Sequence, residues 1–247
     1  MQEHVWENEY QKRRLVSGSI EPQASVKDFL RWLRRERGIP LEHLRVLDLG
    51  CGNGKNSNYI CSLDMTNRAI GIDISETALT EARSHAYDME VEEQVSFSKH
   101  SIGSSFPFQN ESFDIVLDVT SSNSLNEKER TIYMSETARV LKGASASPKD
   151  PTNTTGGYFF VRALCKDGDT NAQHLLKMNP GPERDTYRMP ELGLIERVFS
   201  REDFIETYTG GAAPLFTLHH IEKETHYTKF AGRSYKRNFW IAYLQKI

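Results

Sequence analysis

A glycine-rich turn that follows an apolar segment constrains the fold of this chain more than any other feature. Residues 46–54 read Val-Leu-Asp-Leu-Gly-Cys-Gly-Asn-Gly, the pattern of a buried strand that ends in a tight turn and runs into a helix. Glycines at positions 50, 52 and 54 let the backbone bend sharply and let a ligand approach it closely. By itself, this turn could bind one of several nucleotide cofactors or be an ordinary loop.

Two acidic residues narrow the choice of ligand. Asp48 lies inside the expected strand, and Asp73 follows Gly52 by 21 residues, where a second strand should end. Dinucleotide enzymes place a glycine turn here so that a pyrophosphate can sit at a helix N-terminus. S-adenosylmethionine (SAM) instead carries an ammonium and a sulfonium, and a carboxylate near the turn suits both. A carboxylate at position 73 can also accept both ribose hydroxyls. Together these residues favour SAM over NAD, although either acid alone could be an ordinary turn residue.

Strand and helix signals alternate along most of the chain, which predicts an α/β fold with a mostly parallel sheet and helices on both faces. We expect strands at 44–49, 69–74, 95–98, 113–119, 158–164, 217–227 and 238–244, and helices at 26–38, 76–86, 127–141 and 201–208. Ser200 should cap the last of these helices. In the helix at 127–141, we expect Ile132, Thr137, Val140 and Leu141 to face inwards. Residues 143–157 are predicted to form an inserted flexible loop, and residues 166–196 an irregular region.

Composition limits the compartment and the partners. The chain has 247 residues and a net charge of −3, whereas a chain that binds mainly nucleic acid is usually more basic. Three widely spaced cysteines argue against a disulfide framework, and no Cys-x-x-Cys pair suggests zinc. The histidines show no metal-ligand spacing either, so we predict no metal. The polar N-terminus is unlike a signal peptide, and no apolar run approaches the roughly 20 residues of a membrane span. We therefore expect a soluble, cytoplasmic protein.

Taken together, these segments resemble the class I SAM-dependent methyltransferases, in particular their type 11/25-like domain. The family's glycine motif matches residues 46–54, and its acidic second-strand motif matches Asp73. Residues 106–116 look like the segment leading into the family's fourth strand, and 139–143 with 156–160 look like its helix-turn-strand. The resemblance covers about residues 40–165 and continues more weakly to the end. It implies a Rossmann-like, seven-stranded sheet whose last strand is antiparallel, with SAM as cofactor and S-adenosylhomocysteine as product.

The resemblance also implies which residues hold SAM. The methionine part would lie along the glycine turn, Asp73 would hold the ribose, and Ile74 would pack on the adenine. Ser101 stands where many relatives have an aspartate that accepts from the adenine amino group; a serine accepts more weakly, so backbone groups would have to help. The predicted cofactor site comprises Asp48, Gly50, Cys51, Gly52, Asn53, Asp73, Ile74, Ser101, Ile102, Asp118, Val119 and Thr120, the last three beneath the methyl-bearing sulfur.

The acceptor should lie beyond the carboxyl ends of the strands, over residues 118–125. This stretch lacks the Asn/Asp-Pro-Pro-Tyr motif with which nucleic-acid amino methylases hold a flipped base. The region at 166–196 is the expected acceptor lid, with Tyr187, Arg188 and Glu191 as polar candidates, or it is an ordinary connecting loop. Trp6 and Tyr10 could close over SAM, or they could belong to a packed surface segment.

The segment at 226–240 interleaves Lys229, Arg233, Lys236 and Arg237 with aromatic residues. It could be an RNA surface, it could bind an anionic small acceptor, or it could be a hairpin with buried aromatics and solvated cations.

We predict a single domain over residues 1–247, with an N-terminal helical cap at 1–40, a SAM-binding core at 41–165, and an acceptor-side lid with C-terminal strands at 166–247. The predicted function is methyl transfer to a small molecule by in-line displacement, in which orientation is the main catalytic device. No catalytic residue is identified, because a general base is needed only if the acceptor must lose a proton. The alternatives are an RNA methyltransferase that uses 226–240, a non-catalytic SAM-binding partner subunit, and an NAD enzyme.

Overall fold

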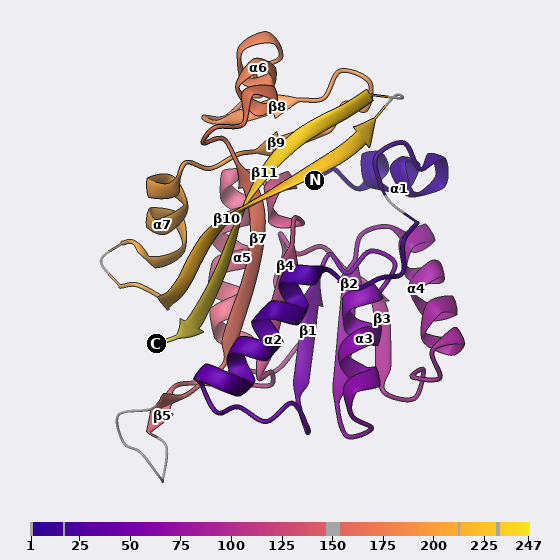
Figure 1. Ribbon diagram of the computed structural model, residues 1–247, viewed down its shortest axis with the longest axis vertical. Coiled ribbons are helices and arrows are strands. Elements are labelled where there is room, and N and C mark those ends of the chain that lie inside the picture. The colour runs from indigo at the N-terminus through magenta and orange to yellow at the C-terminus, as the bar shows by residue number, and fades with distance from the viewer. Residues whose placement is uncertain (1, 17, 147–153, 212, 231–232) are drawn as a thin grey trace.

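A twisted seven-stranded sheet forms the centre of the molecule in the computed structural model, which describes residues 2–16, 18–146, 154–211, 213–230 and 233–247 (Figure 1). The strand order is β10-β11-β7-β4-β1-β2-β3. The bounds are β1 Arg45–Leu49, β2 Arg68–Asp73, β3 Val95–Lys99, β4 Ile115–Val119, β7 Tyr158–Cys165, β10 Phe216–Phe230 and β11 Arg233–Lys246. Strands β3, β2, β1, β4 and β7 are parallel, whereas β11 runs antiparallel to both β7 and β10. The predicted Rossmann-like sheet with an antiparallel last strand is confirmed.

Helices cover both faces of this sheet, and Figure 1 shows α2 and α3 in front of it and α5 behind. The helices are α1 Glu3–Lys12, α2 Ala24–Glu36, α3 Lys55–Leu63, α4 Glu76–Asp88, α5 Glu127–Val140, α6 Thr170–Met178 and α7 Arg201–Thr209, with a short 3-10 turn η1 at Ser122–Ser124. One core cluster joins the sheet to α2, α3 and α4, and a second joins it to α5 and α7. In β1, Val46 belongs to the first cluster and Leu47 to the second, as expected for a strand buried on both faces.

Side-chain caps fix where several helices begin. Ser200 accepts a hydrogen bond from the main chain of Asp203 and starts α7, as the sequence predicts. Asn126 and Glu129 form a reciprocal capping box at the start of α5. The expectation that Ile132 faces inwards is wrong, because this side chain is 39% exposed. The buried stripe of α5 follows Tyr133 and Thr137, and at 100° per residue this places Ile132 on the outer side.

The region at 166–196 is more regular than predicted. It contains α6, which Asp169 caps through the main chain of Ala172, and a small antiparallel pair of β8 Thr186–Arg188 with β9 Ile195–Arg197. In the loop at 143–157, strands β5 Ser145–Ala146 and β6 Thr154–Thr155 pair, and residues 147–153 lie outside the described part of the chain.

The β10–β11 hairpin extends past the carboxyl ends of the parallel strands. The pairing of β11 with β7 stops at Asn238 and Cys165, so residues 233–237 of β11 project beyond β7. In Figure 1 the hairpin leans towards α1 at this end of the sheet. Among the described residues, no helix combines the length and apolar character that a membrane crossing requires.

Candidate functional site

A cavity of about 330 Å³ lies at the carboxyl edge of the parallel strands, roofed by α1 and the N-terminal segment. Its volume is in the ordinary range for small-molecule sites, and its position beyond the strand ends is where open α/β sheets bind ligands. The cavity has two ends. The first, here called the cofactor end, is formed by the segments after β1, β2 and β3; the second, the acceptor end, is formed by β4, β7, β9 and β11.

Ten of the predicted cofactor residues line this cavity: Gly50, Cys51, Gly52, Asn53, Asp73, Ile74, Ser101, Ile102, Val119 and Thr120. The glycine turn wraps over the end of β2, because the main-chain N–H groups of Gly50 and Cys51 both donate to the carbonyl of Ile72. Gly50 and Gly52 have φ values of 66° and 55°, the left-handed region that favours glycine. A methyl group on Gly50 would collide with Ser121, and one on Gly52 would collide with the hydroxyl of Tyr10.

The carboxylate of Asp73 ties the glycine turn to the start of α4. Its Oδ2 accepts from the main chain of Gly52 at 2.9 Å, and its Oδ1 accepts from that of Ser75 at 2.9 Å. The side chain is 7% exposed, and burial raises its pKa against the opposing effect of these hydrogen bonds. Each carboxylate oxygen has a second lone pair, so Asp73 can still accept hydroxyl groups from a ligand in the cavity.

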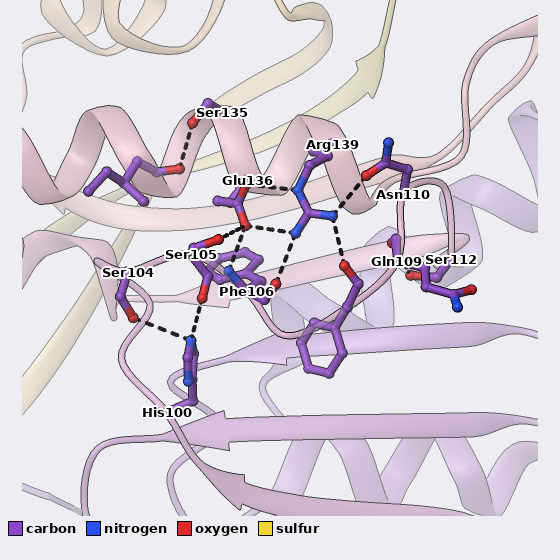
Figure 2. Close-up of polar contacts among 12 residues, drawn as sticks. His100, Ser104, Ser105, Phe106, Gln109, Asn110, Ser112, Ser135, Glu136 and Arg139 are labelled. Atoms are coloured by element: carbon purple, nitrogen blue, oxygen red, sulfur yellow. Dashed lines mark hydrogen bonds and ion pairs between the residues drawn. The ribbon is translucent and has the colours of Figure 1, made fainter.

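The loop after β3, which includes Ser101 and Ile102, is fixed to α5. Figure 2 shows the contacts that Ser105 and Phe106 of this loop make with Glu136 and Arg139. Glu136 accepts from the main chain of Phe106 at 2.5 Å, and Arg139 donates to the Phe106 carbonyl at 3.0 Å. The hydrogen bond from Arg139 is the main reason that the pKa of Glu136 falls to about 2. The cavity wall at Ser101 is therefore held by an ion pair outside the cavity.

Glu129 adds a carboxylate to the cofactor end that the sequence prediction missed. It lines the cavity together with Ser101 and Ile102, and its side chain packs against Gly103. The Oγ of Ser101 accepts from the main chain of Gly103 at 3.1 Å and so stabilises this loop. The spacing Asn126-Glu129 is a capping-box pattern and could have placed Glu129 at the N-terminus of α5.

Two predicted cofactor residues, Asp48 and Asp118, do not line the cavity. Asp48 accepts from Ser57 Oγ at 2.7 Å, and burial raises its pKa to about 7. Asp118 accepts from the hydroxyl of Tyr133 at 2.6 Å and from the main chain of Ser121 at 2.9 Å. Both carboxylates lie behind the wall, where they hold the segments that form it.

Helix α1 covers the cavity and brings Trp6 and Tyr10 into its lining. The indole nitrogen of Trp6 donates to Ser124 Oγ at 3.2 Å. Glu7 accepts hydrogen bonds from the hydroxyls of Ser75 and Thr77 at the start of α4. Burial alone would raise the pKa of Glu7, but these hydrogen bonds lower it to about 2.

Gln2, which precedes α1, anchors the chain to the opposite side of the cavity. Its amide nitrogen donates to the carbonyls of Ser124 and Ile195 at 2.9 and 2.6 Å, and its carbonyl accepts from the main chain of Ile195 at 2.6 Å. The N-terminal segment therefore bridges η1 and β9 above the acceptor end.

Two arginines dominate the acceptor end: Arg237, from the segment for which an anionic small acceptor was one of the predicted alternatives, and Arg162, which the sequence prediction missed. Arg162 donates from Nε to Glu224 at 2.9 Å, and its guanidinium carbon lies 3.4 Å from the ring centroid of Phe239. Arg237 donates to the hydroxyl of Tyr187 at 2.6 Å. Arg162 interrupts the otherwise apolar sequence of β7, Tyr-Phe-Phe-Val-Arg-Ala-Leu-Cys. A charged residue inside an apolar strand was the sequence signal that could have identified Arg162 as a site residue.

The three predicted acceptor residues do not reach the cavity. Tyr187 is buried beside it and connects Arg237 to Glu196, whose Oε2 accepts the tyrosine hydroxyl at 2.7 Å. Arg188 is exposed and donates to a nearby carbonyl, and Glu191 is exposed on the same surface. Strands β8 and β9 therefore contribute Glu196 to the lining, one strand away from the predicted positions.

The described residues of the segment at 226–240 belong to β10 and β11, and the two named cations whose side chains are described differ in exposure. Arg237 is buried at the cavity, Lys236 is exposed, and the side chains of Lys229 and Arg233 lie outside the described residues. Its aromatic residues Phe239 and Trp240 are buried. No group of three or more metal-ligating side chains occurs among the residues that the structure describes.

The two ends together suit a reaction between two bound molecules. A methyl donor bound at the glycine turn and a methyl acceptor bound at the arginines would both lie beneath α1. Their reacting atoms would meet near Val119 and Thr120, away from bulk water. Alignment of this kind can contribute several kcal/mol, up to about 7–11 kcal/mol in favourable cases.

Comparison with known proteins extends this account. A family model described as a methyltransferase domain matches residues 41–173, more than half of the chain. Among curated proteins, none matches the sequence.

Many solved structures are similar to this chain, among them the following three, whose TM-scores are above 0.6. One concerns the conversion of a disulfide bond into a thioacetal group during echinomycin biosynthesis (TM-score 0.68, 17% identity, covering 100% of this chain and 92% of that chain). A second is 1,6-didemethyltoxoflavin-N1-methyltransferase of Burkholderia thailandensis (0.64, 16%, 99% and 86%). A third is a SAM-dependent methyltransferase from Anabaena variabilis (0.62, 16%, 99% and 95%). At these identities, the similarity establishes the fold.

Proposed function

The chain belongs to the class I SAM-dependent methyltransferases, and we propose that it transfers the methyl group of SAM to a small-molecule acceptor bound at the acceptor end of the cavity. Membership of the family makes SAM the cofactor and S-adenosylhomocysteine the product. The similar toxoflavin enzyme was solved with S-adenosylhomocysteine and a small-molecule acceptor together, which supports an acceptor of this size.

The observation that carries the proposal is the roof over the acceptor end. Gln2 joins η1 to β9 through three hydrogen bonds, and Trp6 donates to the same turn. A polymer could reach the cavity only by displacing this segment, whereas a small molecule can be enclosed by it. Arg237, which an RNA surface at 226–240 would need, is buried, and the comparisons lend no support to an RNA acceptor.

We assign roles to the cofactor end as follows. The main chain of Gly50 and Gly52 lies along the methionine part, Asp73 accepts from the ribose hydroxyls, and Ile74 packs on the adenine. Ser101 and Glu129 face the adenine edge, where the Glu129 carboxylate is a stronger acceptor than the Ser101 hydroxyl. The observations in support are the positive φ angles of the turn, the unsatisfied lone pairs of Asp73 and the position of Glu129 in the lining.

When bound, SAM supplies an activated methyl group, which is displaced from sulfur as a lone pair of the acceptor forms the new bond. The task of the protein is to align the two molecules and to exclude water. Val119 and Thr120 lie between the two ends, and Trp6 and Tyr10 close the cavity above them. The three parts of the chain then act as one domain, with 1–40 as the cap, 41–165 as the cofactor core and 166–247 as the acceptor side.

The test is turnover with a mixture of acceptors. Purified protein is incubated with SAM and a metabolite extract, with and without ribonuclease, and S-adenosylhomocysteine is measured. We expect S-adenosylhomocysteine to form at the same rate with and without ribonuclease. We also expect mass spectrometry to find a methylated small molecule in the extract. Activity that ribonuclease abolishes would favour an RNA acceptor, and binding of SAM with no turnover would favour a non-catalytic subunit.

A further inference from the structure

Two arginines at the acceptor end are buried but have few hydrogen-bond partners. Arg162 and Arg237 are 6% and 8% exposed, and both line the cavity. Within the described residues, Arg162 donates only through Nε, and Arg237 donates only through one terminal nitrogen. The Nε of Arg237 is buried without a hydrogen-bond partner. Because guanidinium N–H groups that lose water are costly unless they are paired, these donors fit a site that a ligand completes.

The acidic groups around the two arginines are already engaged. Glu224 accepts from Arg162 at 2.9 Å. Asp169 lies 3.7 Å from Nε of Arg237, but it accepts main-chain hydrogen bonds at 2.8 Å from both α6 and β11. Glu196 accepts a tyrosine hydroxyl at 2.7 Å. None of the three supplies a hydrogen bond to the remaining guanidinium donors among the described residues.

A third cation lies close to this pair. Lys55 also lines the cavity, and its pKa is lowered by burial and by the positive charge of Arg162. Arg162 thus has two cationic neighbours in the cavity lining, Arg237 at the acceptor end and Lys55 at the start of α3, and the mutual repulsion falls if an anion binds among them.

Besides the polar side chains of Gln2, Ser124 and Glu196, the acceptor end has an apolar, partly aromatic surface. Trp6, Phe239, Leu125 and Leu164 line it, and the guanidinium of Arg162 stacks on the ring of Phe239. The stacking fixes the plane of the guanidinium, which favours in-plane hydrogen bonds to a planar partner.

Building on the proposed function, we propose that the acceptor is a planar, mainly apolar molecule that carries a carboxylate, and that Arg162 and Arg237 bind this carboxylate. A carboxylate has the planar, forked geometry that pairs with guanidinium N–H groups through charge-assisted hydrogen bonds. The aromatic and aliphatic residues enclose the rest of the molecule. The carboxylate serves here as the group by which the acceptor is recognised.

The experiment compares two probes of similar shape, one anionic and one neutral. Protein saturated with S-adenosylhomocysteine is titrated calorimetrically with benzoate and with benzamide. We expect benzoate to bind at least tenfold more tightly. We expect this preference to disappear in Arg162→Gln and Arg237→Gln, and to persist in Arg188→Gln, an exposed arginine outside the cavity. The affinity for S-adenosylhomocysteine should be the same in all four proteins.

Equal binding of the two probes, binding of neither, or a preference that survives in both cavity variants would overturn the proposal. If a glutamine variant does not fold, Arg162→Lys and Arg237→Lys keep the charge but lose the fork. They should weaken benzoate binding at least threefold, and an unchanged affinity would count equally against it. Failure of S-adenosylhomocysteine to bind the wild-type protein would instead contradict the proposed function, so the two failures are distinguishable.

Discussion

The two ends of the cavity are built in different ways. The cofactor end consists of three turns that each follow a parallel strand, and in our proposal it contacts the ligand largely through main chain and through Asp73. The acceptor end consists of side chains from β7, β9, β11 and the N-terminal segment, which are far apart in the sequence. The first end can therefore be recognised from local sequence, whereas the second exists only after the sheet and its roof have formed.

The largest expected effect lies in the glycine turn. Gly50→Ala adds the strain of a left-handed residue and a collision with Ser121, whose hydroxyl is itself bonded to Leu49. Strain of about 1–2 kcal/mol and overpacking of about 1–3 kcal/mol should displace the turn and weaken S-adenosylhomocysteine binding by at least about 30-fold. Gly38→Ala is the matched control, because its φ is 65° but nothing lies within 4 Å of the added methyl group. The affinity of both variants is measured by calorimetry. An equally small loss of affinity in Gly50→Ala and Gly38→Ala would contradict the placement of the glycine turn against the ligand.

The next effect concerns Asp73. Asp73→Ala removes a buried acceptor and should weaken S-adenosylhomocysteine binding by about 1–3 kcal/mol, or roughly 5- to 150-fold. Asp64→Ala removes a carboxylate that accepts a similar turn hydrogen bond, from Thr66, outside the cavity, and should leave binding unchanged. Unchanged affinity in a folded Asp73→Ala protein would remove the ribose assignment.

A smaller effect is expected where α1 meets the cofactor end. Glu7 has its pKa lowered to about 2 from an ordinary 4.5, so the stability that it contributes is present above about pH 4.5 and is lost as the pH falls through about 2. In NMR spectra, the indole N–H signal of Trp6 should keep its docked position above about pH 4.5 and shift as the pH falls towards about 2. Glu7→Gln should release S-adenosylhomocysteine several-fold faster, whereas Glu3→Gln, which breaks an exposed ion pair with Lys99, should not. Identical release rates in the two variants would argue that Glu7 does not hold the roof.

The smallest effect on binding is expected at Asp48, which lies behind the wall. Asp48→Asn should change the affinity for S-adenosylhomocysteine less than about threefold, because no ligand contact is lost. The free energies of unfolding of the wild-type protein and of Asp48→Asn should depend differently on pH. Burial raises the pKa of Asp48 from 3.8 to about 7, so the contribution of the neutral acid is full below pH 3.8 and is lost as the pH rises through about 7. Urea unfolding should show the wild-type protein losing stability relative to Asp48→Asn over that interval. A large loss of affinity in the variant would place Asp48 against the ligand after all.

The contrast between the ends also explains what the sequence could predict. The turn at 46–54, Asp73 at its fixed distance and the cap at Ser200 are local patterns, and each appears in the structure where it was expected. Arg162 and Glu196 could not be predicted as cavity residues. Their places in the cavity lining depend on the pairing of β7 with β11 and of β8 with β9, and neither pairing has a local signature.

Tyr187 shows the same limit on a smaller scale. It was selected as a polar residue of an irregular region, but the pairing of β8 with β9 turns it into the core and presents its partner Glu196 to the cavity. The predicted inward position of Ile132 is wrong for a different reason. Apolar character alone does not fix which side of a helix is buried.

The most direct test of the account is a crystal structure of the protein with S-adenosylhomocysteine. We predict the ribose hydroxyls on Asp73, the adenine beside Ile74 and Glu129, and the sulfur towards Val119 and Thr120, with Arg162 and Arg237 left free for the acceptor. A ligand bound in the reverse direction, with its adenine among the two arginines, would contradict the division of the cavity into a cofactor end and an acceptor end.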